Sequence, residues 1–246
     1  MIFFVTGGSR GLGEAIVVEA VRHGHDVAFT YLRQRDRAEA VVSRARAIDP
    51  ARRVTADQLD VRDPDAVERV ADKVLEQFGT VDVLVANAGV NLNGLLVSMS
   101  DEDWSTVIDT NLTGTFYLSR QFLPTFLANR FGRIIIMSSL GHTGVAGQAG
   151  YAASKAGLLG LSATIAKEYG RKGITSNVVI PGFIDTDLTR EDMSPANRAF
   201  WLQYCPLGRS ATPEEVSSVV LFLATEGASY INGQSIRVNG GLDWAP

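Results

Sequence analysis

Tyr151 and Lys155 are the two residues whose types and spacing most directly suggest chemistry. A helical pattern begins at Tyr151, and a spacing of four places the phenol and the ammonium on one face of a helix, about one turn apart. A phenol has an ordinary pKa of about 10. A neighbouring ammonium favours the phenolate, so we expect Lys155 to lower this pKa and to suit the phenol to acid–base chemistry. The pair alone occurs often by chance, so its meaning depends on the elements that position it.

Those elements alternate regularly between strand and helix. Buried apolar runs separated by amphipathic stretches predict a parallel sheet covered by helices on both faces. We therefore expect an α/β fold in which residues 1–246 form a single doubly wound (Rossmann) domain with a seven-stranded parallel sheet. The predicted strands are residues 2–6, 26–31, 54–58, 81–87, 133–138, 175–180 and 235–238, and the predicted helices are about 11–23, 35–47, 64–78, 102–129, 151–171 and 213–225.

A glycine-rich turn follows the first predicted strand directly. It reads Thr6-Gly7-Gly8-Ser9-Arg10-Gly11-Leu12-Gly13 and leads into a helical pattern. Glycine allows positive φ angles and lets a ligand approach the backbone without a Cβ in the way. The first turn of a helix presents unpaired N–H groups and a partial positive charge to a phosphate. Between a strand and a helix, this turn predicts a dinucleotide site formed by Gly7, Ser9, Arg10, Gly11, Leu12 and Gly13.

The end of the second strand bears on which dinucleotide is bound. NAD-specific sites usually place an acidic residue there to bind the ribose 2′-hydroxyl, but this chain has no acid between that strand and Asp36. Arg10 and Arg33 could together bind a 2′-phosphate, or they could be two solvated surface arginines. We expect NADPH/NADP+ as the cofactor, with Tyr31, Asp60 and Val61 at its adenosine end and Asn87, Ala88 and Gly89 beside its ribose.

Composition excludes several other classes of protein. The 246 residues carry a net charge of −4, with both signs scattered along the chain. No block of basic residues therefore suggests a nucleic-acid-binding surface. No apolar run is long enough to span a bilayer. Cys205 is the only cysteine, and the three histidines have no ligand-like spacing, so we expect neither a disulfide nor a metal site. These features fit a cytoplasmic protein.

Several further motifs occur in order along the chain. They are Asn87-Ala88-Gly89, Asn111, the pair Ser138-Ser139, Tyr151-x-x-x-Lys155 and Pro181-Gly182. Together with the glycine-rich turn, they resemble the short-chain dehydrogenase/reductase family over essentially the whole chain. Within that family, the stretches 147–151, 173–179, 181–186 and 238–241 are most similar to 3-oxoacyl-[acyl-carrier-protein] reductases.

The resemblance implies NADPH-dependent reduction of a ketone to a secondary alcohol in fatty-acid or related acyl-chain biosynthesis. Tyr151 would donate a proton to the carbonyl oxygen, and a serine would hydrogen-bond that oxygen. Lys155 would bind the nicotinamide ribose and bias the pKa of Tyr151. Asn111 would help to hold a water that connects Lys155 to solvent. The nicotinamide side of the site would include Pro181, Gly182, Ile184 and Thr186.

Two ways of counting disagree on the serine. Counting forward along the strand from Gly132 places the family's serine at Ser139, and counting back from Tyr151 places it at Ser138. A residue is therefore missing either from the strand or from the loop that follows. A deletion inside a buried strand would turn its side chains to the wrong face, whereas a shorter loop costs little. We favour Ser139 and keep Ser138 as the alternative.

The least regular stretch, about 185–212, is a candidate lid over the substrate. Its aromatic residues could cover an acyl chain or could pack a short helix onto the body; they are Phe200, Trp201 and Tyr204. The resemblance implies that acyl carrier protein docks on basic residues near the mouth of the site, here Arg130 and Lys172, although these could be ordinary exposed residues at element ends. It also implies a homotetramer.

Two alternatives remain at this stage. A related short-chain dehydrogenase could act on a sugar, a steroid or a polyketide-type ketone, because substrate identity depends on the lid. A non-catalytic dinucleotide sensor could share the fold, although a sensor needs only the cofactor half of the site and this chain also carries Tyr151, Lys155 and Asn111.

Overall fold

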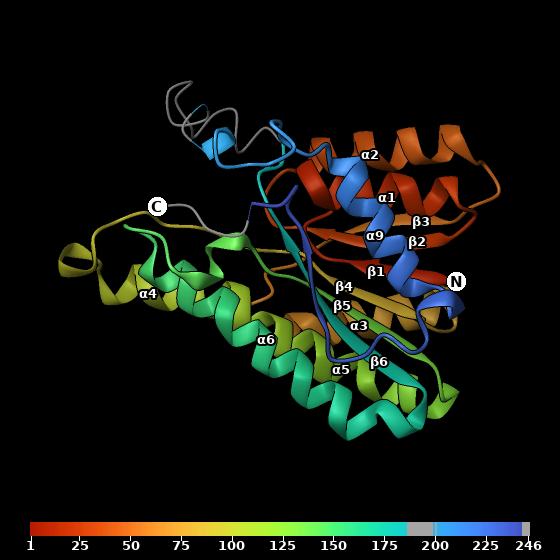
Figure 1. Ribbon diagram of the computed structural model, residues 1–246. Helices are drawn as coiled ribbons and strands as arrows, with labels where there is room; N and C mark the ends of the chain where they lie inside the picture. Colours follow the sequence, from red (N-terminus) through yellow and green to blue (C-terminus); the bar gives the residue numbers. More distant parts are fainter. Residues whose placement is uncertain (186–198, 200, 243–246) are drawn as a thin grey trace.

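Seven parallel strands form one sheet in the computed structural model, which describes residues 1–185, 199 and 201–242 (Figure 1). The strand order is β3-β2-β1-β4-β5-β6-β7. The order reverses between β1 and β4, which is the switch point at which doubly wound sheets bind their ligands. The predicted fold class is therefore confirmed.

The strands are short and, apart from β3 and β7, almost wholly buried. They are β1 (Ile2–Val5), β2 (Asp26–Tyr31), β3 (Val54–Gln58), β4 (Val83–Ala86), β5 (Gly132–Met137), β6 (Ile174–Pro181) and β7 (Ser235–Val238). Every predicted strand is present, and each boundary lies within two residues of its prediction. Continuous apolar runs gave this signal because both faces of a parallel sheet are covered.

Helices cover both faces of the sheet. They are α1 (Gly11–Arg22), α2 (Arg35–Ile48), α3 (Pro64–Phe78), α4 (Asp101–Ile108), α5 (Gly114–Asn129), α6 (Ala149–Tyr169) and α9 (Pro213–Ala224). Figure 1 shows α1, α2 and α9 on one face, with α3, α5 and α6 on the other. No helix in the described part of the chain is long and apolar enough to cross a membrane.

Alternating residues of a strand pack into two separate hydrophobic cores, one on each face of the sheet. Phe3 and Val5 of β1 belong to the core beneath α1, α2 and α9. Phe4, between them, belongs to the core beneath α3, α5 and α6. Successive side chains of a strand point to opposite faces, so one short strand anchors both helical layers. This anchoring fixes β1, whose carboxyl end leads into the glycine-rich turn.

The predicted helix over 102–129 differs from the structure. It is divided by a π-helical segment, Asp109–Thr113, between α4 and α5. A π turn accommodates one extra residue and is frequent at functional sites. Gly114 follows it, and a Cβ there would lie 2.8 Å from the Val61 side chain. Hydrophobic periodicity does not reveal such a local change in winding, and the prediction of one uninterrupted helix was wrong.

Candidate active site

The glycine-rich turn is built by backbone geometry that other residues would disturb. Gly7 has a φ of 68° and Gly11 a φ of 56°, values that favour glycine. A Cβ on Gly13 would lie 2.2 Å from the Gly7 carbonyl oxygen. Asn87 braces the turn from β4, because its side-chain amide donates to the Thr6 carbonyl at 2.9 Å. The open backbone at the start of α1 fits a dinucleotide pyrophosphate.

The turn lies against the end of β2. The Gly8 amide donates to the Thr30 carbonyl at 2.9 Å. The side chains of Arg10 and Arg33 are exposed at this edge, and Tyr31 is half-buried. The next strand, β3, ends beside them and leads into Asp60, whose carboxylate is bound by Arg62. Sequence reasoning identified Asp60 but missed Arg62, which the spacing of two residues after an acid could have suggested.

The structure brings Ser139 and Tyr151 together and turns Ser138 away. The Ser139 side chain is close enough to the phenol to oppose, by hydrogen bonding, part of the rise in the Tyr151 pKa. The Ser138 hydroxyl instead donates to the main-chain carbonyl of Lys155 at 3.0 Å. Ser139 also accepts a bond from the Gly141 amide at 3.2 Å, which fixes the start of the loop after β5. Of the two candidate serines, only Ser139 faces the phenol.

Lys155 is buried behind the phenol. Its side chain is 4% exposed, and its ammonium donates to the Met137 carbonyl at 2.8 Å. The ammonium nitrogen lies 5.7 Å from the centroid of the Tyr151 ring. Burial lowers the pKa of Lys155 to about 8, because removal from water disfavours the charged form.

The expected effect of Lys155 on the phenol differs from what the structure shows. Burial raises the pKa of Tyr151, and the hydrogen bond with Ser139 only partly opposes this shift. Spacing along the helix correctly placed the two groups on one face, but it could not reveal that the phenol is desolvated. The prediction of a lowered Tyr151 pKa was wrong, and a phenol in this state holds its proton at neutral pH.

Asn111 connects the π-helical segment to the loop after β4. Its Oδ1 accepts from the Val90 amide at 2.8 Å, and its Nδ2 donates to the Val90 carbonyl at 2.9 Å. Nδ2 also donates to the Ser154 hydroxyl at 3.0 Å. Because Ser154 adjoins Lys155, these bonds join α6, the π turn and the Gly89-Val90 segment into one hydrogen-bonded unit. A Cβ on Gly89 would lie 3.3 Å from the Lys155 ammonium nitrogen.

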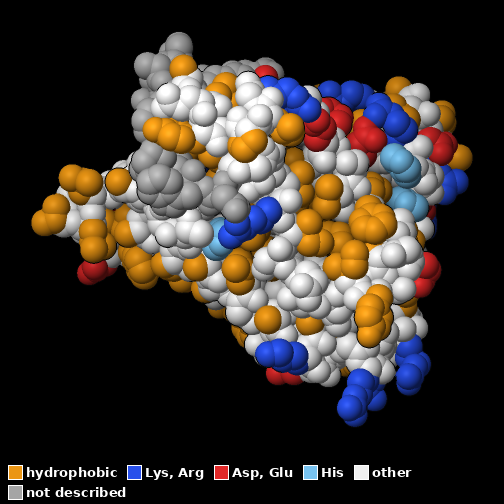
Figure 2. Space-filling model, viewed as in Figure 1, with side chains coloured by type: hydrophobic (Ala, Val, Ile, Leu, Met, Phe, Trp, Pro, Cys, Tyr) orange, Lys and Arg blue, Asp and Glu red, His pale blue; other side chains and the backbone are white. Residues whose placement is uncertain are grey.

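The loop after β4 continues along the border of the site. A bridge pairs Gly94 with Gln148, and the Gln148 side chain donates to Asn93 at 3.1 Å. These contacts tie the loop to the residues just before Tyr151. Beyond them, an arm exposes three apolar side chains, and Figure 2 shows hydrophobic side chains gathered there, at the left of the view; the arm contains Leu95, Leu96 and Val97.

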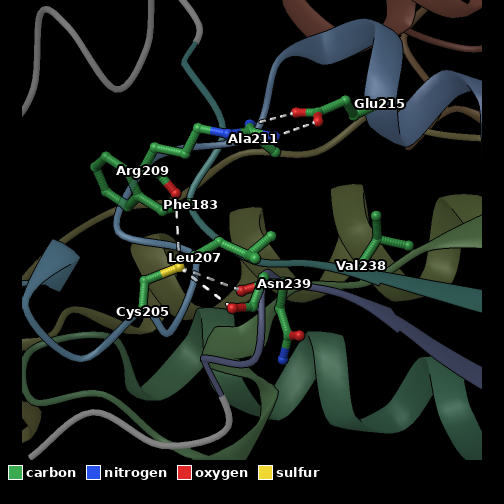
Figure 3. Close-up of a pocket in the computed structure, with 9 residues that line it drawn as sticks. Phe183, Cys205, Leu207, Arg209, Ala211, Glu215, Val238 and Asn239 are labelled. Atoms are coloured by element: carbon green, nitrogen blue, oxygen red, sulfur yellow. Dashed lines mark hydrogen bonds and ion pairs between the residues drawn. The ribbon is translucent and has the colours of Figure 1, made fainter.

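The candidate lid begins and ends in two segments that are hydrogen-bonded to each other. The Ala211 amide donates to the Phe183 carbonyl at 2.8 Å, and the Asp185 amide donates to the Ala211 carbonyl at 2.9 Å. Figure 3 shows Arg209 bound through two nitrogens to Glu215 at the start of α9. Beside these contacts lies a cavity of about 100 Å³ lined in part by Phe183. We call this group of contacts, between 183–185 and 209–215, the lid root.

Several predicted residues lie at or near the lid root, and others cannot be placed. Gly182 is held by a bond from its amide to the Val238 carbonyl at 3.0 Å, and Pro181 and Ile184 are buried. Trp201 is half-buried and Tyr204 is exposed. Thr186 and Phe200 lie outside the described residues.

Arg130 and Lys172 are not near the catalytic groups within one chain. Arg130 ends α5, and Lys172 lies in the short 3₁₀ turn that follows α6. Tyr151 is in the first turn of α6, a helix of 21 residues. At 1.5 Å per residue, roughly 30 Å separates the two ends of that helix. The expected position beside the mouth of the site was therefore wrong for a single chain.

Strand order and the position of these groups define the class of protein. The glycine-rich turn lies at the switch point, and the phenol and the buried amine lie on the same edge of the sheet, at the start of α6, the helix that follows β5. The chain is an α/β oxidoreductase that uses a nicotinamide dinucleotide.

Comparison with known proteins agrees with this class, and the chain belongs to the short-chain dehydrogenase/reductase family. The model of a family described as "Enoyl-(Acyl carrier protein) reductase" matches residues 7–243. The chain is similar to "3-oxoacyl-[acyl-carrier-protein] reductase FabG" of Staphylococcus aureus (strain Mu50), with 42% identity over 97% of this chain and 96% of the relative. The same name is carried by a Salmonella typhimurium (strain LT2) protein with 41% identity over 98% of this chain and 96% of that protein.

Proposed function

We propose that this enzyme reduces a 3-oxoacyl group carried on acyl carrier protein to the 3-hydroxyacyl group, with NADPH as the reductant. The observation that carries the proposal is the position of Tyr151, with the buried Lys155 ammonium 5.7 Å from its ring centroid and the Ser139 side chain close to its phenol. Two hydroxyls that converge on one point suit a carbonyl oxygen that gains negative charge during the reaction. The names of the relatives support the acyl-carrier-protein substrate.

Tyr151 acts as the proton donor in this proposal. The raised pKa of Tyr151 keeps the phenol protonated at neutral pH, as a donor requires. Ser139 hydrogen-bonds the same carbonyl oxygen and orients it. When bound, the nicotinamide cofactor supplies the hydride for the carbonyl carbon. The direction favoured by the protonated phenol is therefore reduction of a ketone.

Lys155 holds the cofactor ribose and replaces the proton that Tyr151 gives up. With a pKa of about 8, its ammonium is mostly charged at neutral pH yet can release a proton readily. Asn111 keeps the surrounding backbone in place through Val90 and Ser154, and we assign it the water that links Lys155 to solvent. Residues 181–186 form the nicotinamide side.

The preference for NADPH rests on charge at the adenosine end. Arg10 and Arg33 are exposed beside the glycine-rich turn, and guanidinium groups suit a phosphate well. Residues of the turn would hold the pyrophosphate, and Asn87, Ala88 and Gly89 would contact the ribose. We assign residues 185–212 as a lid of the single domain, in which Phe200, Trp201 and Tyr204 cover the acyl chain.

Docking of the carrier protein on Arg130 and Lys172 needs more than one chain. Both residues lie at the far end of α6 from Tyr151, so they would serve a site only if a second copy brought them to it. The homotetramer and the cytoplasmic location both stay predictions. Replacing both cations with glutamate would lower turnover on carrier-linked ketones and spare free thioesters if such docking occurs.

A substrate screen tests the proposed function. The purified enzyme is mixed with NADPH or NADH and with 3-oxoacyl, enoyl or unrelated ketone substrates, both free and carrier-linked, while oxidation of the cofactor is followed. We expect the fastest turnover with carrier-linked 3-oxoacyl groups and NADPH, and a loss of at least about a hundredfold in Tyr151→Phe. Faster turnover of an enoyl group or a sugar would reassign the substrate. Cofactor binding without any turnover would indicate a sensor.

A further inference from the structure

The loop after β5 brings Ser139 into the site through one tight turn. Ser139 is still extended, with a φ of −160°, and it caps the short 3₁₀ helix Leu140–Thr143. Its hydroxyl accepts a hydrogen bond from the Gly141 amide at 3.2 Å. This bond occupies a lone pair of the hydroxyl oxygen and leaves the hydroxyl proton free for a ligand. The direction in which Ser139 can donate therefore depends on the turn that follows it.

His142 binds the other polar group of Ser139, its main-chain carbonyl. The main-chain amide of His142 donates to that oxygen at 3.0 Å, and the ring Nδ1 lies 2.7 Å from the same oxygen. A carbonyl oxygen can only accept, so Nδ1 carries a proton and donates it. The half-buried imidazole thus adds a second hydrogen bond to the one that the backbone of the turn already makes.

Glycines make the shape of this turn dependent on such bonds. Gly141 lies within the turn, and Gly144, with a φ of 103°, ends it. Glycine loses more conformational freedom on ordering than any other residue. A Cβ on Gly141 would lie 3.3 Å from Cε1 of Tyr151, so the turn packs directly against the phenol ring. A loosened turn would therefore disturb both Ser139 and the space beside Tyr151.

We propose that His142 is a positioning residue for the reduction: by donating from Nδ1 to the Ser139 carbonyl, its imidazole keeps the Ser139 hydroxyl aimed at the substrate carbonyl. The inference rests on the proposed function and extends it to a residue that acts through Ser139. Spacing along the chain did not single out His142, because the group that it binds belongs to the main chain.

Substitutions that retain one or neither ring nitrogen test the inference. The amide nitrogen of asparagine is as many bonds from the backbone as Nδ1 is, whereas that of glutamine corresponds to Nε2. We expect His142→Ala and His142→Gln to lower kcat roughly tenfold and His142→Asn to stay within about threefold of the wild type, since a small misplacement of a reacting group is costly. The Kd of NADPH should change little in all three, because the glycine-rich turn is untouched.

A double variant shows whether His142 acts through Ser139. In Ser139→Ala the hydroxyl is already absent, so adding His142→Ala should lower kcat by less than about a further twofold. A merely structural role would add its full loss to that of Ser139→Ala. A second loss of roughly tenfold in the double variant therefore overturns the inference.

His23→Ala is the matched control. The His23 Nδ1 lies 2.8 Å from the Glu19 carbonyl, at the end of α1 that is remote from the glycine-rich turn. We expect its kinetic constants to match those of the wild type. Full activity in His142→Ala overturns the inference, and so does a His142→Asn variant that is as slow as His142→Gln or slower.

The wild type separates this inference from the proposed function. Faster turnover of another class of ketone would overturn the proposed substrate, while the comparison of His142 variants on that ketone would still decide the inference. A wild type that turns over no ketone at all overturns both.

Discussion

The Ser138 hydroxyl is bonded to the main-chain carbonyl of Lys155, and this contact leaves Ser139 as the serine that faces Tyr151. The two adjacent hydroxyls therefore have different roles, one structural and one at the catalytic site. Ser138 ties the end of β5 to the first turns of α6, and Ser139 meets the phenol. Adjacent residues of an extended chain point in opposite directions, so both cannot reach the substrate.

Replacing each serine by alanine in turn should distinguish the catalytic role from the structural one. Ser139→Ala removes a donor to the carbonyl oxygen, and we expect kcat to fall by about a hundredfold to a thousandfold. Ser138→Ala should keep kcat within about threefold of the wild type, but lower the free energy of unfolding by about 1 kcal/mol through the lost buried hydrogen bond. Steady-state kinetics and urea denaturation measure the two effects. The reverse pattern, with activity lost only in Ser138→Ala, would assign catalysis to Ser138.

The lowered pKa of Lys155 leads us to expect that the rate of ketone reduction declines at high pH. Its pKa of about 8 lies well below the ordinary value, whereas that of Tyr151 is raised, so Lys155 loses its proton first as pH rises. We expect kcat/KM for a 3-oxoacyl thioester to be constant below pH 8 and to decline above it, because kcat/KM reports groups of the free enzyme. In Lys155→Met, the residual rate should lack this limb. A wild-type profile that stays flat to pH 10 would contradict the assignment.

The same shift should also appear in folding stability. Because the pKa of Lys155 is lower in the folded chain, the unfolded chain binds more protons between pH 8 and 10.5. The contribution of Lys155 to the free energy of unfolding therefore becomes more favourable as pH rises through this window. Comparison of the wild type with Lys155→Met by urea denaturation at pH 7 and pH 10 isolates that contribution.

Much of the fold could be predicted from the sequence, because each element carries its own local signal. The strands are continuous apolar runs, and α3 has both an Asp63 cap and a left-handed Gly79 at its end. The π-helical segment around Asn111 could not be predicted, since hydrophobic periodicity does not reveal a local change in winding. Nor could its neighbourhood: Gly114, which follows it, packs against Val61, a residue more than 50 positions away in the sequence.

The sequence predicted the position of Tyr151 relative to Lys155, but not the electrostatics of the pair. Spacing placed Tyr151 and Lys155 on one face, and strand counting favoured Ser139. The direction of the Tyr151 pKa shift depends on how fully the phenol is removed from water, which only tertiary packing decides.

The lid root should control how well the nicotinamide side of the site is formed. Arg209 binds Glu215 at 2.6 and 2.8 Å, and the adjoining Ala211 is paired with residues 183–185. The pKa of Glu215 is lowered to about 2, chiefly by this arginine, so the pair stays charged throughout the range in which the enzyme can be assayed. We expect Arg209→Gln to lower kcat/KM roughly tenfold by misplacing residues 183–185, with the effect mainly in KM.

Arg35→Gln is the matched control, because Arg35 forms an exposed pair with Glu39 at 2.8 Å in α2, away from the lid root. Equal effects in both variants, or none in Arg209→Gln, would show that the lid root does not position the site.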